Sequence, residues 1–233
     1  MTTVSLPARS PLAHGPTQFL LRRLHSLTGI LFGGYVIIHL LVNATLIQGM
    51  SEGGTLTVYQ VQVDKIHSLP FLLLVEWSTI YLPILFHTFY GLWLTYTGQP
   101  NVAQYPYGKN VFYTFQRITA LVLVFFIFFH VFGMKGLFGP TLTFDPQHAT
   151  QSTINHMNAS WFIGWFIYPI GILCAAFHLA NGFWTAAISW GLTVSAAAQK
   201  RWGWVCFALF LFTLGCGLTA LVATLGPAAA AAH

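Results

Sequence analysis

The chain has 233 residues, of which 56% are hydrophobic and 6% charged, whereas charged residues make up roughly 25% of an ordinary soluble domain. This composition excludes a soluble globular protein. Nine basic residues against four acidic ones give a net charge of +5, but the basic residues form no dense run and match no nucleic-acid motif, so we do not expect nucleic acid as a partner. The class that remains is a polytopic membrane protein.

Five apolar segments are long enough to cross a bilayer as helices, since a hydrocarbon core of about 30 Å requires about 20 helical residues. In chain order they cover about Leu24–Gln48, Pro70–Tyr96, Phe112–Lys135, Ser160–Trp190 and Trp202–Leu225. The first is too long for the core of a cleavable signal peptide, so we expect it to remain in the protein. The sequence therefore predicts an all-α fold, a five-transmembrane-helix integral membrane bundle that forms one domain over residues 1–233.

The basic residues predict how this bundle is oriented in the membrane. Seven of them flank one side of it: Arg9, Arg22, Arg23, Lys109, Arg117, Lys200 and Arg201. Because only Lys65 and Lys135 flank the other side, the positive-inside rule places the N-terminus in the cytoplasm and the Ala-rich C-terminal tail outside. The inner loop Thr97–Asn110 is either a plain connector or a docking surface. The outer loops, about Gly49–Leu69 and Gly136–Ala159, are long enough to fold over the mouth of the bundle.

Four of the ten histidines lie deep in the first four apolar segments: His39, His87, His130 and His178. Counted at about 1.5 Å per residue from the outer end of each helix, His39 and His130 lie about 8–15 Å deep, and the other two lie about 25 Å deep. The four histidines therefore form two tiers, one near each face of the membrane.

Two histidines at matched depth on different helices are suited to hold a b-type haem. The six-coordinate iron takes a neutral nitrogen from each side, and imidazoles on facing bundle helices supply both without placing a charge in the hydrocarbon. For a single intramembrane histidine, an interhelical hydrogen bond is the simpler explanation. Four histidines in two tiers instead favour two haem groups, with the first four helices forming a haem-binding four-helix bundle.

A short internal repeat supports the haem interpretation. The motif H-x3-G-x-W occurs in the second and fourth segments, as His87, Gly91 and Trp93 and again as His178, Gly182 and Trp184. A glycine four residues after a histidine lies about 40° away on the same helical face, where it lets a macrocycle approach the backbone. Small residues also serve helix packing in membranes, so each glycine alone does not decide between the two explanations.

Glu76 is the only carboxylate within an apolar segment. It precedes His87 by eleven residues, about 20° of rotation on a regular helix, which would point it into the bundle near the outer tier. A carboxylate there costs several kcal/mol unless it is protonated, paired or hydrated, so we predict a functional role in proton exchange with a quinone. The alternative is a protonated Glu76 that is hydrogen-bonded to a neighbouring helix.

Polar residues gather at the inner boundary of the first segment: Arg22, Arg23, His25 and Ser26. Their cationic and hydroxyl groups are candidates to pair with the propionates of the inner haem or with a partner's surface. Side chains that merely reach the membrane interface explain them equally well. Three further histidines belong to the outer loops or a helix start and are expected to be solvated or interfacial, namely His67, His148 and His156.

These motifs together resemble the single-chain, five-helix, two-haem cytochrome b anchor subunits of succinate:menaquinone oxidoreductases and fumarate reductases. The resemblance runs from about Phe19 to Val194. Besides Glu76 and the four histidines, it rests on Arg22-Arg23-Leu24-His25-Ser26, Leu40-Leu41-Val42-Asn43, Ser68-Leu69-Pro70-Phe71, Leu82-Pro83, Tyr90-Gly91, Gln104-Tyr105, Gln116-Arg117, Thr119, Asn181-Gly182-Phe183-Trp184 and Ser189-Trp190-Gly191-Leu192-Thr193-Val194.

The resemblance implies that His39 and His130 hold a distal haem near the outside, and that His87 and His178 hold a proximal haem near the cytoplasm. It also implies a flavoprotein subunit and an iron–sulfur subunit on the cytoplasmic face of a bacterial inner membrane. Electrons would pass outward through the two haem b groups to menaquinone, with Glu76 as the proton carrier. This chain has no flavin or cluster motif of its own.

One departure from the family bears on the direction of the reaction. Some fumarate-reducing members carry a glutamate two residues before the fourth histidine, where this chain has Ala176, so the sequence favours succinate oxidation. Two other functions stay open. One is the haem anchor of a formate dehydrogenase or hydrogenase, with ligands distributed differently over the helices. The other is a proton-coupled transporter with a histidine relay, for which broken helices or midplane sites are expected.

Overall fold

The computed structural model describes residues 15–48, 57–98 and 102–225. These residues form helices and no β-strand. The α-helices are α1 (Pro16–Ala44), α2 (Val58–His67), α3 (Leu72–Glu76), α4 (Leu82–Thr97), α5 (Gly108–Met134), α6 (Ala149–Asn158), α7 (Tyr168–Ser189) and α8 (Ala196–Leu225). Short 3-10 turns cover Thr45–Gln48, Pro140–Leu142 and Pro146–His148, and π-helical turns cover Trp77–Tyr81 and Ile163–Ile167.

Five of the helical stretches are long and apolar enough to cross a membrane: Pro16–Gln48, Leu72–Thr97, Gly108–Met134, Ile163–Ser189 and Ala196–Leu225. The five predicted spans are thus confirmed, and the chain is a multi-pass membrane protein. The first and last helices begin eight and six residues earlier than predicted, because polar residues that the hydropathy argument left out continue the helix. Arg9, Glu52 and the Ala-rich tail lie outside the described residues.

Two of the membrane helices contain a π-helical turn just before a proline. Trp77–Tyr81 precedes Pro83 in α4, and Ile163–Ile167 precedes Pro169 in α7. Proline lacks a backbone N–H and its ring clashes with the carbonyl of the preceding turn, and a wider turn relieves this conflict without ending the helix. Both helices therefore continue through the proline to their histidines.

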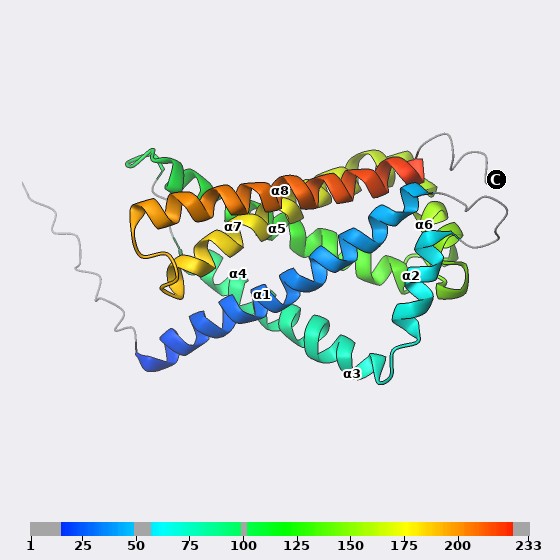
Figure 1. Ribbon diagram of the computed structural model, residues 1–233, viewed down its shortest axis with the longest axis horizontal. Helices are drawn as coiled ribbons and strands as arrows, with labels where there is room; N and C mark the ends of the chain where they lie inside the picture. The colour runs from blue at the N-terminus through cyan, green and yellow to red at the C-terminus, as the bar shows by residue number, and fades with distance from the viewer. Residues whose placement is uncertain (1–14, 49–56, 99–101, 226–233) are drawn as a thin grey trace, which may run out of the picture.

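The long helices extend between the same two ends of the molecule, and α1 crosses α4 at an angle (Figure 1). α1 packs against α4 and α8, and α7 packs against α5 and α8. α1 and α7 approach each other closely at Gly33, where a Cβ atom would lie 2.6 Å from Leu179 Cδ1. Large apolar side chains remain exposed along the outside of the helices, among them Ile38, Phe89 and Phe125, as expected for a surface that faces lipid.

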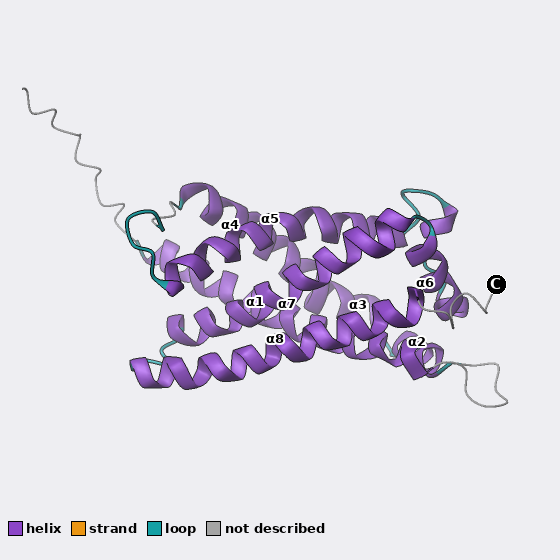
Figure 2. Ribbon diagram, turned by 90° about the horizontal axis from the view of Figure 1, so that it is seen from above, coloured by secondary structure: helices purple, strands orange, loops and turns teal. Residues whose placement is uncertain are grey.

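The two short helices α2 and α6 cover the end of the bundle where α1 stops and α5 ends (Figures 1 and 2). Gln60 joins them, since its amide nitrogen donates to the carbonyl oxygen of Pro146 at 2.7 Å and its amide oxygen accepts from the Ala149 N–H at 2.7 Å. Tyr59, Val63 and Ala149 form a small buried cluster between the two helices. The predicted outer loops thus contain helices, and they do fold over the bundle. We call α2 and α6 the cap.

Candidate haem-binding site

The structure brings the four candidate ligands together as two pairs. The ring centroids of His39 in α1 and His130 in α5 are 5.8 Å apart, with 75° between the ring planes. Those of His87 in α4 and His178 in α7 are 6.2 Å apart, with 87° between the planes. These pairs are the same ones that the sequence proposed from depth and from the resemblance.

Both separations fit two imidazoles that bind one metal ion from opposite sides. A nitrogen–metal distance of about 2 Å on each side places the two ring centroids about 6 Å apart. Nearly perpendicular rings are compatible with this arrangement, because each ring can turn about its own nitrogen–metal direction. The spacing within each pair therefore suits bis-histidine ligation of a haem iron.

We call His87 and His178 the inner pair and His39 and His130 the outer pair. Hydrogen bonds fix the orientation of both rings of the inner pair. His87 Nδ1 lies 3.0 Å from the backbone oxygen of His25, and His178 Nδ1 lies 3.2 Å from that of Gln116. A carbonyl oxygen only accepts, so Nδ1 donates in both rings and Nε2 keeps its lone pair for a metal. The two contacts span the same 62 residues of sequence, so the internal repeat also extends to the contacts that hold the inner histidines.

The inner rings are also held by packing. A Cβ atom on Gly29 would lie 2.7 Å from His87 Cε1, so the ring of His87 rests against the backbone of α1. The ring of His25 stacks on its face, with centroids 4.1 Å apart and planes 9° from parallel. On the other side, the Gln116 amide donates to the His178 backbone oxygen at 3.0 Å and accepts from Asn181 at 2.8 Å.

The outer pair is held by side chains rather than by backbone carbonyls. His130 Nδ1 lies 2.9 Å from the hydroxyl of Tyr168, which lies 2.8 Å from Nε2 of His156. His39 has weaker contacts, with Tyr35 Oη 3.5 Å from its Nδ1 and Asn43 Nδ2 3.4 Å from its Nε2. Because Asn43 Nδ2 is a donor, that last contact also assigns the lone pair of His39 to Nε2.

The prediction that His156 is solvated or interfacial is wrong. Its side chain is 0% exposed, because α6 turns the face bearing it toward the bundle. Burial, partly offset by the hydrogen bond to the Leu142 carbonyl, lowers the pKa of His156. His67 and His148 are exposed, as predicted.

The predicted propionate-binding residues, Arg22, Arg23, His25 and Ser26, do not form one group. His25 packs against His87, whereas Arg23 and Ser26 contact Trp190. The Arg23 guanidinium lies over the rings of Phe19 and Trp190, 4.9 and 5.0 Å from their centroids. Trp190 Nε1 donates to Ser26 Oγ at 3.0 Å, so these residues form one cluster at the inner end, while Arg22 is exposed.

The two motif glycines have different neighbours. A Cβ atom on Gly91 would lie 3.1 Å from His25 Nε2, whereas one on Gly182 would lie 3.6 Å from the Gln116 amide nitrogen. Gly91 therefore makes room for His25, while the contact at Gly182 is an ordinary one. Gly98 makes room for the guanidinium of Arg117, whose Nη2 donates to the Leu94 carbonyl at 3.2 Å.

Four buried side-chain atoms have no hydrogen-bond partner among the described residues: His25 Nε2, Arg117 Nη1, Tyr90 Oη and Thr193 Oγ1. The first two are nitrogens that can bind an anionic group. They face Gly91, within α4, and Gly98, the residue directly after the end of α4. A buried donor left unpaired is costly, and an arginine is suited to bind a carboxylate. Sequence reasoning did not single out Arg117 as a site residue, although its position beside Gln116 was part of the resemblance.

Glu76 is the last residue of α3 and directly precedes the π-helical turn Trp77–Tyr81. Its side chain is half-buried and forms no hydrogen bond or ion pair with any residue that the structure describes. The π-helical turn adds about one residue to the helix, which changes the angle to His87 by about 100° relative to a regular helix. The predicted rotation of Glu76 therefore does not apply.

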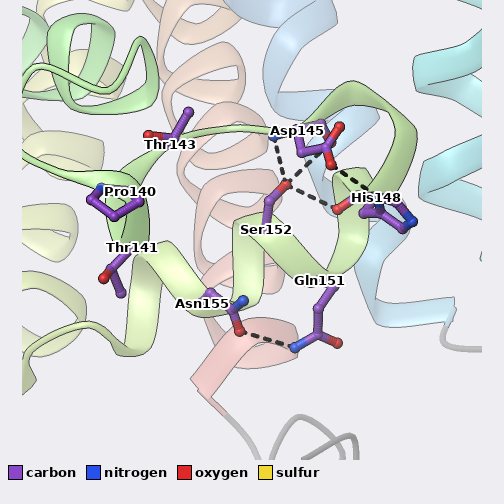
Figure 3. A pocket seen from close by; sticks show the side chains of 8 residues that line it. All are labelled: Pro140, Thr141, Thr143, Asp145, His148, Gln151, Ser152 and Asn155. Atoms are coloured by element: carbon purple, nitrogen blue, oxygen red, sulfur yellow. Dashed lines mark hydrogen bonds and ion pairs between the residues drawn. The ribbon is translucent and has the colours of Figure 1, made fainter.

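A polar pocket of about 260 Å³ lies on the outer side of α6, away from the histidine pairs (Figure 3). Asp145 accepts hydrogen bonds from His148 Nδ1 at 2.8 Å and from the Gln147 N–H at 2.9 Å, and both lower its pKa. Gln151 donates to Asn155 at 2.9 Å across the same pocket. The polar side chains on this face of α6 thus pair with one another, and the opposite face of the helix is buried.

The fold and the histidine pairs define a membrane-spanning helical bundle of the cytochrome type. Comparison with known proteins agrees: residues 107–215 match the family model described as succinate dehydrogenase/fumarate reductase transmembrane subunit. Over 212 residues the chain is 30% identical to the succinate dehydrogenase cytochrome b558 subunit of Bacillus subtilis (strain 168), which covers 90% of this chain and 98% of that protein. The chain belongs to this family, and its function is that of the membrane-anchor cytochrome b of succinate dehydrogenase.

Proposed function

We propose that the subunit holds two haem b groups, one between His39 and His130 and one between His87 and His178. The observation that carries this proposal is the geometry of the two pairs, with ring centroids 5.8 and 6.2 Å apart and hydrogen bonds that leave Nε2 of His87, His130 and His178 free for a metal. The unpartnered His25 Nε2 and Arg117 Nη1 would bind haem propionate, and Arg23 and Ser26 lie at the same inner end.

Haem, when bound, accepts and releases single electrons, and the subunit would use it to carry electrons from an iron–sulfur subunit to menaquinone. The protein would hold each iron from two sides and keep the haem propionates at the polar boundary of the membrane. We infer succinate oxidation as the direction, since the fully buried Ala176 stands where some fumarate-reducing members carry a glutamate.

We further propose that the iron–sulfur and flavoprotein subunits bind at the cytoplasmic end, on a bacterial inner membrane. The basic residues Lys109, Lys200 and Arg201 lie at the starts of α5 and α8, at the end of the bundle where α1 also begins (Figure 1). The positive-inside rule supports the cytoplasm for that end and for the N-terminus. The cap would then lie outside, and menaquinone would react at the outer pair with Glu76 as its proton carrier.

Ligand substitutions test the haem assignment. In the purified complex, His130→Ala should remove the outer haem and keep most of the inner one, and His178→Ala should do the opposite, because each deletion leaves one iron with a single protein ligand. The measurement is haem content together with the reduced-minus-oxidised absorption spectrum. His148→Ala, an exposed histidine outside the spans, is the matched control and should retain both haems.

Two results would contradict this assignment. One is a wild-type complex that contains no b-type haem. The other is a set of single-histidine variants in which His39 and His87 affect the same haem, which would point to another class of respiratory anchor.

A further inference from the structure

A chain of three hydrogen bonds runs from the outer histidine pair through His156 of the cap to the backbone oxygen of Leu142. His130 Nδ1 lies 2.9 Å from Tyr168 Oη, Tyr168 Oη lies 2.8 Å from His156 Nε2, and His156 Nδ1 lies 2.8 Å from the backbone oxygen of Leu142. The side chains of His156 and Tyr168 are 0% and 7% exposed. Neither residue was expected to touch the site from the sequence alone.

The last acceptor determines the direction of the whole chain. The Leu142 carbonyl oxygen can only accept, so His156 Nδ1 carries a hydrogen, and the neutral ring then accepts at Nε2. Tyr168 must therefore donate its hydroxyl hydrogen to His156, and its oxygen accepts from His130 Nδ1. This arrangement leaves the lone pair of His130 on Nε2, which is the atom available to the metal.

The chain can run in this direction only while His156 is neutral. A charged ring would donate from both nitrogens, so Tyr168 would turn its hydrogen toward His130 and the lone pair would no longer be on Nε2. Burial lowers the pKa of His156, which favours the neutral ring. Gly133 lets this ring approach α5, since a Cβ atom there would lie 3.4 Å from His156 Cε1.

We infer that Tyr168 and His156 are positioning residues for the outer haem: they fix the tautomer of His130 and increase the electron donation of its ring to the iron. This inference rests on the proposed haem ligation. It also explains a difference between the tiers. The inner ligands His87 and His178 donate to backbone carbonyls, and the Thr119 hydroxyl also lies 3.3 Å from His178 Nδ1. The acceptor of His130 differs because it is a hydroxyl polarised by a second histidine, which comes from the cap.

An acceptor for the Nδ1 hydrogen makes an imidazole a stronger donor and thereby stabilises the ferric iron more than the ferrous iron. Its removal should raise the reduction potential of the outer haem only. A loss of about tenfold in the relative stability of the ferric form corresponds to about 59 mV for a one-electron couple.

The experiment is a redox titration of the purified complex, followed by the absorption of the two haems. Tyr168→Phe should raise one of the two potentials by about this amount and leave the other in place. His156→Leu should move the same haem in the same direction by less, since Tyr168 can still accept from His130. His156→Gln should stay near the wild-type potential, because an amide can accept from Tyr168 and donate to Leu142.

Tyr59→Phe is the matched control, since Tyr59 donates or accepts only at Thr153, 3.4 Å away within the cap, and touches neither histidine pair. Its potentials should equal those of the wild type. If Tyr168→Phe loses the outer haem, the two His156 variants provide the test. The inference is supported if the potential of the outer haem shifts in His156→Leu but stays at the wild-type value in His156→Gln.

Two results would overturn the inference while the complex still binds both haems. In one, Tyr168→Phe and His156→Leu titrate like the wild type. In the other, Tyr59→Phe shifts the outer haem as much as Tyr168→Phe does, which would assign the effect to cap packing. A complex without haem would instead refute the proposed function itself.

Discussion

At the scale of single residues, Glu76 is the side chain whose chemistry is least explained by packing. It lies in an apolar span, half-buried, and forms no hydrogen bond or ion pair within the described residues. An ionised carboxylate in this environment is costly, and a carboxyl group that has no structural partner is free to take up or release a proton. The π-helical turn that follows it is a feature often found at functional sites.

Glu76→Gln should slow quinone reduction by about a hundredfold, since an amide keeps the shape of the side chain but cannot transfer a proton. Succinate oxidation with a soluble dye as acceptor should persist, because that reaction bypasses the quinone. Both rates are measured on the same purified complex. Asp145→Asn, which removes an exposed carboxylate of the cap, should alter neither rate. Unchanged quinone reduction in Glu76→Gln would leave this residue without a proton-transfer role.

The spacing of histidines in the sequence predicted which ones would meet, but it could not predict what holds them. His87 and His178 are held by the backbone oxygens of His25 and Gln116, and any residue supplies a backbone oxygen, so no sequence pattern marks it. His156 was misassigned for a related reason. It lies in a short polar segment, and only the packing of α6 against the bundle determines that this histidine is buried.

At the scale of elements, α1 and α4 approach each other closely where His87 meets Gly29. A Cβ atom on Gly29 would lie 2.7 and 2.9 Å from Cε1 and Nδ1 of His87, closer than van der Waals contact. The ring cannot easily move aside, because its Nδ1 is hydrogen-bonded to the His25 oxygen and its face is stacked on the His25 ring. The two helices thus define the position of this ligand together.

Gly29→Ala should therefore weaken binding of the inner haem by about tenfold, as is typical when the support of a ligand is disturbed. The effect opposes intrinsic helix propensity, since alanine stabilises a helix relative to glycine. Haem content and the spectrum of the purified complex measure it. Gly215→Ala in α8 is the control, because its Cβ would meet nothing within 4 Å. Full occupancy of both haems in Gly29→Ala would show that His87 tolerates the displacement.

The five long helices followed from hydropathy alone, although the first and last begin several residues before their predicted starts. The cap did not, since α2 and α6 are each ten residues long and contain no long apolar run. Their stability depends on contacts such as those of Gln60. The π-helical turns were also missed. A proline in an apolar segment predicts a kink in the helix, but it does not predict that a π-helical turn forms before the proline.

At the scale of the whole molecule, the two ends of the bundle differ: one carries basic residues and the other is covered by short helices. The end where α1, α5 and α8 begin carries Arg22, Arg23, Lys109, Lys200 and Arg201, whereas the opposite end is covered by the cap (Figure 1). Basic residues resist transfer across the membrane, so the charged end should stay in the cytoplasm, where soluble partners can bind it. The outer pair and its hydrogen-bond chain then lie under the cap, on the opposite side from those partners.

Cysteine labelling tests this orientation. Gln151→Cys, on the pocket face of α6, should react with a membrane-impermeant maleimide in spheroplasts, because the proposed orientation places the cap outside. Lys200→Cys, at the start of α8, should react only after the membrane is permeabilised. The unmodified chain is the control, since Cys174, Cys206 and Cys216 all lie within the spans. If Lys200→Cys reacts from outside and Gln151→Cys does not, the charged end is external. The partner subunits and the outer haem would then have to exchange sides, although the histidine pairing itself would stand.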